Sequence, residues 1–135
     1  MTTALTKRIS ETILDTWPAM RMSGAAADAI VRDLGVLPEI AAERERQDEK
    51  WGEQNHPDGT GPGFAIDAKR ARHRCNLAAA LGLVSYRDIL NEEVFEAFAE
   101  SDPDKLRVEL IQVAAVAVAW IEKLDRERNA LESNG

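Results

Sequence analysis

The sequence has little cysteine and no long apolar run, and each shortage excludes a class of protein. Cys75 is the only cysteine, which excludes an internal disulfide and favours a reducing cytoplasm. The longest apolar run, Val113 to Ile121, is too short to span a bilayer. The N-terminus also lacks the charged-then-apolar pattern of a signal peptide. We therefore expect a cytoplasmic protein without membrane contact.

Positive charge is also in short supply. The 135 residues include 24 acidic and 17 basic side chains, which gives a net charge of −7. An acidic surface repels the phosphates of long nucleic acids, so we expect no such partner. A small nucleotide is compatible with this charge where a cation neutralises its phosphates. Taken alone, the acidity is more typical of a protein that is simply soluble.

Aromatic residues make up only 5% of the chain, although 44% of it is apolar. Alanine, leucine, glutamate and arginine are abundant, and this composition favours helix over sheet. A chain of this length builds one modest core, which small domains often complete by forming oligomers. The sequence therefore predicts an all-α fold, a helical bundle.

Helical periodicity and end signals divide the chain into six expected helices. Ser23, Ser85 and Asp102 are the expected N-caps, while Gly35 and Gly82 are expected stops. The approximate helix ranges are 5–17, 25–34, 38–51, 65–81, 86–100 and 103–131, followed by a tail, 132–135, that we expect to fray. Residues 52–63 form a long loop rich in glycine and proline, which is typical of a functional segment. We expect an N-terminal helical extension over 1–36 and a helical domain over 37–135.

Polar side chains are paired at helical spacing on the last two expected helices. Glu93 and Glu96 are three residues apart, as are Glu109 and Gln112, so each pair shares a helix face. The short link at Asp102 makes the two helices an antiparallel hairpin. Glu96 and Glu109 then stand about 10 Å above the turn, and Glu93 and Gln112 about 15 Å. The sequence therefore predicts that three carboxylates and one amide oxygen converge.

The apolar run from Leu110 to Ile121 predicts that the last helix is central and buried. Buried carboxylates are costly unless they are paired or hold a metal ion. Oxygen ligands alone favour Mg²⁺, with Mn²⁺ as a second candidate. The alternative is a salt-bridged bundle in which Arg or Lys neutralises the carboxylates. We expect Glu92, the neighbour of Glu93, on a solvated face, and Cys75 to be a small helix residue with no positioned base beside it.

This pattern resembles the MazG-like, all-α nucleoside triphosphate pyrophosphohydrolases, which show EExxE, a spacer and then ExxD. The corresponding residues here are Glu92-Glu93-Val94-Phe95-Glu96 and Glu109-Leu110-Ile111-Gln112, where Gln112 replaces the usual aspartate. A second stretch, KWGEQNHP, is similar to the tryptophan, glutamine and histidine that precede the metal helices in the family. The likeness covers about residues 39–125 and is greatest to small members of phage and actinobacterial type.

The resemblance implies a magnesium-dependent enzyme that splits a nucleoside triphosphate, with ribose or deoxyribose, into monophosphate and pyrophosphate. Glu93, Glu96 and Glu109 would be metal ligands, and Gln112 would stand at the fourth ligand position. Glu93 or Glu96 would also act catalytically by orienting or deprotonating the attacking water. The family commonly forms homodimers or homotetramers, and we expect the same here.

The resemblance also implies substrate contacts before and beside the metal motif. Trp51 would stack on the base, and Gln47 or His56 would hydrogen-bond it, while Lys50 and Lys105 would meet phosphates. Gln54 would be a further substrate contact. Trp51 packing on the core and a solvated His56 are the alternatives. Four further cations are each more typical of a solvated helix face, namely Lys69, Arg70, Arg72 and Arg74.

Two other functions are compatible with the sequence. The first is a non-catalytic nucleotide or metal-binding protein, in which Gln112 marks the loss of chemistry. The second is a helical interaction protein, in which the acidic residues are only a solvated or salt-bridged surface.

Overall fold

A computed structural model describes residues 23–135 of the chain and five residues before them, 7, 8, 11, 12 and 15. The chain divides into two compact units, residues 1–54 and residues 55–135. The helix predicted over 5–17 lies largely outside the described residues. The domain boundary predicted after residue 36 falls within the first unit.

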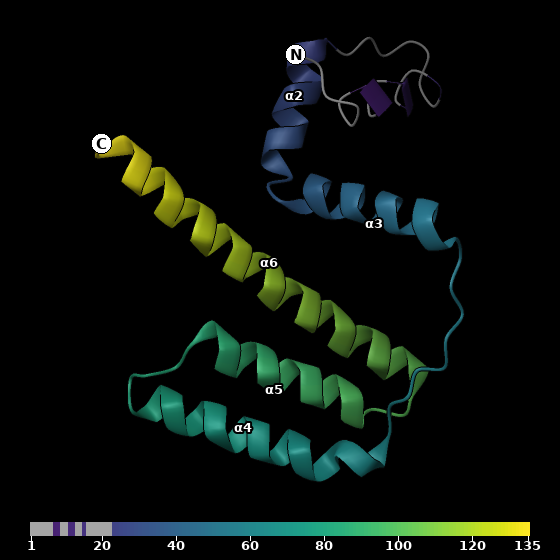
Figure 1. The fold of residues 1–135 in the computed structure, drawn as a ribbon, viewed down its shortest axis with the longest axis vertical. Helices are drawn as coiled ribbons and strands as arrows, with labels where there is room; N and C mark the ends of the chain where they lie inside the picture. The colour runs from purple at the N-terminus through teal and green to yellow at the C-terminus, as the bar shows by residue number, and fades with distance from the viewer. Residues whose placement is uncertain (1–6, 9–10, 13–14, 16–22) are drawn as a thin grey trace. The chain divides into compact units, whose positions relative to one another are not determined.

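The first unit contains α2 (Gly24–Asp33) and α3 (Leu37–Trp51), shown in Figure 1. Ser23 caps α2, because its hydroxyl accepts a hydrogen bond of 3.2 Å from the Ala26 amide. Gly35 follows α2 with a φ of 59°, a conformation that side chains rarely adopt. The predicted cap and stop of this helix are confirmed.

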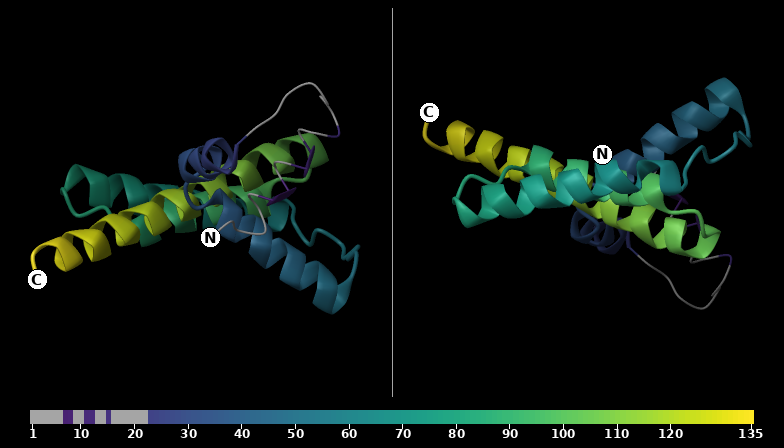
Figure 2. Two further views of the ribbon diagram at one scale, coloured as in Figure 1. Left: turned by 90° about the horizontal axis from the view of Figure 1, so that it is seen from above. Right: turned by 90° about the horizontal axis from the view of Figure 1, so that it is seen from below.

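The second unit contains a short 3₁₀ turn and three helices, named η1 (Pro62–Phe64), α4 (Ala65–Ala80), α5 (Tyr86–Ala99) and α6 (Pro103–Ser133). Figures 1 and 2 show the three helices side by side, each antiparallel to the next along the chain. The middle helix, α5, contacts both α4 and α6. The all-α fold and the antiparallel hairpin at the end of the chain are thus confirmed.

The helix ends of the second unit follow the local signals in the sequence. Ser85 and Asp88 form a complete capping box at the start of α5. At the start of α6, the Asp102 carboxylate accepts hydrogen bonds of 3.0 Å from the amides of Asp104 and Lys105. Gly82 ends α4 with a φ of 70°. Each helix of the hairpin therefore begins where its cap predicts.

Small buried residues and aromatic pairs hold the three helices together. Ala71 and Cys75 of α4 and Ala97 of α5 are buried, and their size permits close approach of the helices. At one end of α5, the rings of Phe64 and Phe98 lie 5.4 Å apart, and the Gly61 amide donates a 2.8 Å hydrogen bond to the Phe98 carbonyl. At the other end, Tyr86 stacks on Trp120 of α6, with 5.8 Å between ring centroids. Aromatic contacts therefore join α5 to η1 at one end and to α6 at the other.

The prediction that the last helix is central and buried is wrong. Within the second unit α5 takes the central place, and α6 lies along one side of it (Figure 1). Val108, Leu110 and Ile111 of α6 are 53%, 50% and 57% exposed. The apolar run predicts burial on all sides, but within the second unit α6 packs mainly against α5, which covers one of its faces.

The C-terminal helix also extends further than expected. It continues through Ser133, whose hydroxyl donates a 2.9 Å hydrogen bond to the Asn129 carbonyl, so the helix ends two residues after the predicted end at 131. Across the described part of the chain, no helix combines the length and the apolar character that crossing a membrane requires.

The Ser85 cap gives a direct test of the start of α5. We expect Ser85→Ala to lower the free energy of unfolding by about 1 kcal/mol, because the Asp88 amide loses its acceptor. Urea unfolding measures this change, with Ser101→Ala as the matched control at an exposed serine outside the helices. Equal losses for the two variants would contradict a capping role for Ser85.

Candidate metal centre

Three carboxylates from two helices converge on one point of the hairpin. Glu93 and Glu96 belong to α5 and Glu109 to α6. Each offers a carboxylate oxygen within 4.8 Å of the other two, and all three residues are half-buried. We call these three residues the acidic cluster. The predicted convergence is observed, while the role of these residues as metal ligands stays a prediction.

The convergence follows from the capped turn between the helices. Glu93 and Glu96 are one turn apart on α5 and so share a face. Glu109 begins the third turn of α6 from the Asp102 cap, which brings it level with Glu96. The stack of Tyr86 on Trp120 further along the hairpin fits the same register.

Gln112 lies against two members of the acidic cluster. With its amide nitrogen facing them, it donates hydrogen bonds of 3.0 Å to Glu93 Oε2 and 3.2 Å to Glu109 Oε2. The opposite orientation brings the amide oxygen toward the same carboxylates, which is unfavourable unless a cation lies between them. Gln112 can therefore act as a donor without a cation and as an oxygen ligand with one.

Arg72 of α4 provides the cation that neutralises part of this charge. Its guanidinium binds Glu96 through two nitrogens, with Nε 2.9 Å from Glu96 Oε1, and Nε lies 3.7 Å from Glu92 Oε1. The sequence named Arg72 only as one of several surface cations. The short link at Gly82 was the available signal, since it makes α4 antiparallel to α5 and brings Arg72 level with Glu92.

Glu92 does not lie on a solvated face, so that expectation is wrong. Its side chain is only 20% exposed, and its carboxylate accepts a hydrogen bond from the buried thiol of Cys75. This hydrogen bond, followed by burial, raises the pKa of Cys75 to about 11. The thiol is therefore neutral at physiological pH and is no nucleophile. The interpretation of Cys75 as a small packed residue is consistent with this geometry.

The cluster carries more negative charge than its neighbours neutralise. Burial raises the pKa of Glu93 above its usual value, and the carboxylates of Glu96, Glu92 and Glu109 raise it further. Arg72 opposes this shift but does not cancel it. Four carboxylates thus face one guanidinium, and a divalent cation would relieve the remaining repulsion.

The donor set fits a hard divalent cation. All the candidate ligand atoms are oxygens, from Glu93, Glu96, Glu109 and, in one amide orientation, Gln112. Oxygen ligands of this kind suit Mg²⁺ or Mn²⁺ better than zinc. The salt bridge from Arg72 satisfies one oxygen of Glu96 and leaves the rest of the acidic cluster without a cationic partner among the described residues.

Two predicted substrate contacts belong to the same unit as the acidic cluster. Lys105 lies in the first turn of α6, one turn before Glu109, and is exposed. His56 lies in the loop before η1 and is also exposed. Both are accessible to a ligand, and neither contacts the acidic cluster directly in the described interactions.

The other predicted contacts belong to the first unit and are described within that unit. The Lys50 ammonium lies 4.6 Å from the centroid of the Trp51 ring, which is exposed at the end of α3. Gln47 is engaged within α3, where it accepts a hydrogen bond from Arg44. Gln54 is exposed just after the helix. Their substrate roles stay predictions.

The raised pKa of Glu93 predicts a stability that depends on pH. Because folding raises this pKa, the folded state binds the proton more tightly, and its stability falls as pH rises from the ordinary value through the raised one. Above the raised pKa, the ionised Glu93 carboxylate lowers the free energy of unfolding by the full amount that the shift represents. We therefore expect Glu93→Gln to stabilise the protein in EDTA, more at pH 7 than at pH 4, as measured by urea unfolding.

Added Mg²⁺ should reverse the ranking of the two proteins. The wild type should gain thermal stability with Mg²⁺, whereas Glu93→Gln should gain far less, because a ligand charge is lost. Glu122→Gln, at an exposed residue of α6, is the matched control. Lower stability of Glu93→Gln than of the wild type in EDTA at pH 7 would contradict this electrostatic account.

Compared with known proteins, the chain matches no family model, no curated protein and no solved structure.

Proposed function

We propose that this protein is a magnesium-dependent nucleoside triphosphate pyrophosphohydrolase, which releases a nucleoside monophosphate and pyrophosphate. The observation that carries the proposal is the acidic cluster, in which oxygens from two helices lie within 4.8 Å of one another. The motif resemblance in residues 92–96 and 109–112 supports it. Mn²⁺ is the second candidate cation.

The proposed chemistry is attack by water on a phosphorus atom. When bound, Mg²⁺ supplies electrostatic stabilisation of the phosphate oxygens and lowers the pKa of a coordinated water. The water oxygen forms a bond to phosphorus, the bond to the pyrophosphate leaving group breaks, and the water proton passes to a carboxylate. Glu93, Glu96, Glu109 and Gln112 would hold the cation.

Glu93 and Glu96 differ in their ion pairs, and this difference suggests a different role for each. Arg72 holds Glu96 through two nitrogens and so fixes its orientation. Glu93 has no such ion pair among the described residues. We therefore assign the orientation and deprotonation of water to Glu93, and cation binding with a fixed geometry to Glu96.

The substrate would be held by the predicted contacts. Lys105, which is exposed one turn before Glu109, would meet a phosphate, and His56, exposed in the loop of the same unit, would hydrogen-bond the base. As the motif resemblance implies, Trp51 would stack on the base and Lys50 would meet a phosphate, with Gln47 and Gln54 as further substrate contacts. The protein would work as a homodimer or homotetramer in which a second copy covers the exposed apolar residues of α6.

Specific observations favour each alternative function. The amide at Gln112 adds no charge and accepts no proton, which favours a nucleotide or metal-binding protein without turnover. The ion pair from Arg72 to Glu96 favours a structural, salt-bridged cluster. The salt-bridged alternative leaves three clustered carboxylates with one cation, which favours a bound metal. The motif resemblance in residues 92–96 and 109–112 favours turnover over binding alone, and for these reasons we prefer the enzyme.

Turnover separates these functions. We expect the purified protein with Mg²⁺ to convert at least one nucleoside triphosphate or deoxynucleoside triphosphate into monophosphate and pyrophosphate, resolved by ion-exchange chromatography. Glu109→Gln should lower the rate by at least about 100-fold, because a charged ligand of the cation is lost. Helix content by circular dichroism should stay unchanged, and Glu122→Gln should retain full activity. Binding without products would favour the non-catalytic protein, and no binding would favour the interaction protein.

Gln112→Asp tests the unusual fourth position. Aspartate adds a negative charge beside Glu93 and Glu109, so we expect tighter Mg²⁺ binding, by about tenfold, in calorimetric titration. The same charge should destabilise the protein in EDTA through repulsion among the carboxylates. Gln112→Ala is the control, since it removes the amide without adding charge. Unchanged Mg²⁺ affinity in Gln112→Asp would place residue 112 outside the metal site.

A further inference from the structure

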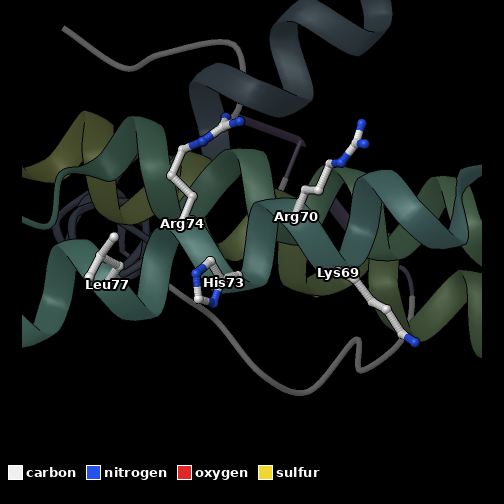
Figure 3. A pocket seen from close by; sticks show the side chains of 5 residues that line it. All are labelled: Lys69, Arg70, His73, Arg74 and Leu77. Carbon is white, nitrogen blue, oxygen red and sulfur yellow. The ribbon is translucent and has the colours of Figure 1, made fainter.

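A second cluster of charge, of opposite sign, lies on α4. Four basic side chains occupy two successive turns of this helix and, with Leu77, line an open depression of about 480 Å³. In Figure 3, Arg70 and Arg74 extend to one side of the helix and Lys69 and His73 to the other. We call these side chains the basic face, which consists of Lys69, Arg70, His73 and Arg74. All four are exposed. In a chain with a net charge of −7, such a concentration of cations is unexpected.

The basic face points away from the acidic cluster. Ala71 and Cys75 form the buried side of α4, toward Glu92 of α5. At 100° per residue, Lys69, Arg70 and His73 fall on the opposite side of the helix. Arg72, between the two sides, is the residue of α4 that reaches Glu96. The basic face is therefore a feature of its own and is separate from the metal centre.

Among the described residues, the basic face forms no ion pair. No ion pair joins Lys69, Arg70 or Arg74 to a carboxylate in the described chain. Hydrogen bonds from the hydroxyl and the amide of Ser85 are the main cause of the lowered pKa of Asp88, and Arg74 contributes to the same shift. An anionic ligand would thus meet at least Lys69 and Arg70 without an ion-pair partner among the described residues.

The spacing of the cations selects a ligand with several charges. Lys69 and Arg70 form one layer and His73 and Arg74 the next, about 6 Å further along the helix axis. One carboxylate or phosphate cannot bind both layers, whereas a chain of phosphates can. Leu77, 52% exposed, adds an apolar surface one turn beyond the second layer, suitable for a base. The depression has the volume of a small-molecule site.

We propose that the basic face of α4 is a second site for a nucleoside di- or triphosphate, with the phosphates on the two cation layers and the base against Leu77. This site needs no divalent cation, because the protein supplies the positive charge. It is independent of the proposed hydrolysis, since no residue of the metal centre takes part.

Binding in EDTA isolates this site from the metal centre. A fluorescent nucleoside triphosphate should bind the full-length protein in EDTA, and Arg70→Gln/Arg74→Gln should weaken binding by about tenfold or more through loss of charge-assisted hydrogen bonds. The charge-matched control is Arg107→Gln/Arg126→Gln, at exposed arginines of α6, and should bind as the wild type does. Glu109→Gln should also leave this binding unchanged.

A second pair of measurements tests the chemistry of the ligand. Leu77→Ser should weaken binding of the nucleotide but not of inorganic tripolyphosphate, which has no base. Should the double variant lose helix content, Lys69→Gln replaces it as a milder change with the same expected direction. Absence of nucleotide binding in EDTA, equal weakening by the control pair, or preference for an acidic peptide or an oligonucleotide would overturn the proposal.

Discussion

The capped turn between α5 and α6 controls which acidic side chains meet. The Asp102 carboxylate binds the amides of Asp104 and Lys105, and the Glu100 carboxylate accepts hydrogen bonds of 2.9 Å from the amides of Ser101 and Asp102. Both ends of the turn are therefore fixed. A slip of one residue would rotate a helix by about 100° and carry its glutamates away from the shared face.

Two neighbours make the acidic cluster tolerable in the absence of a cation. Arg72 neutralises one oxygen of Glu96, and the Gln112 amide bridges Glu93 and Glu109. The same contacts compete with any ion that enters, because a metal must displace the hydrogen bonds or turn the amide over. The hydrogen bonds that stabilise the protein without a metal therefore lower its affinity for the metal.

Local signals predicted the helices and their register, because a cap acts on its own turn. Ser85, Gly82 and Asp102 located α5 and α6 closely enough to anticipate the acidic cluster. Burial was harder to predict, since it depends on how many helices surround each residue. For that reason the exposure of Ile111 and the buried contacts of Glu92 were not anticipated.

The packing of Cys75 against Glu92 has a consequence for studying motion in the helix layer. This thiol is the only one in the chain, is buried, and has a pKa of about 11. A shielded and protonated thiol reacts with an alkylating reagent only after α4 and α5 separate locally. The rate at which Cys75 is alkylated therefore measures how often α4 and α5 separate locally, without any introduced label.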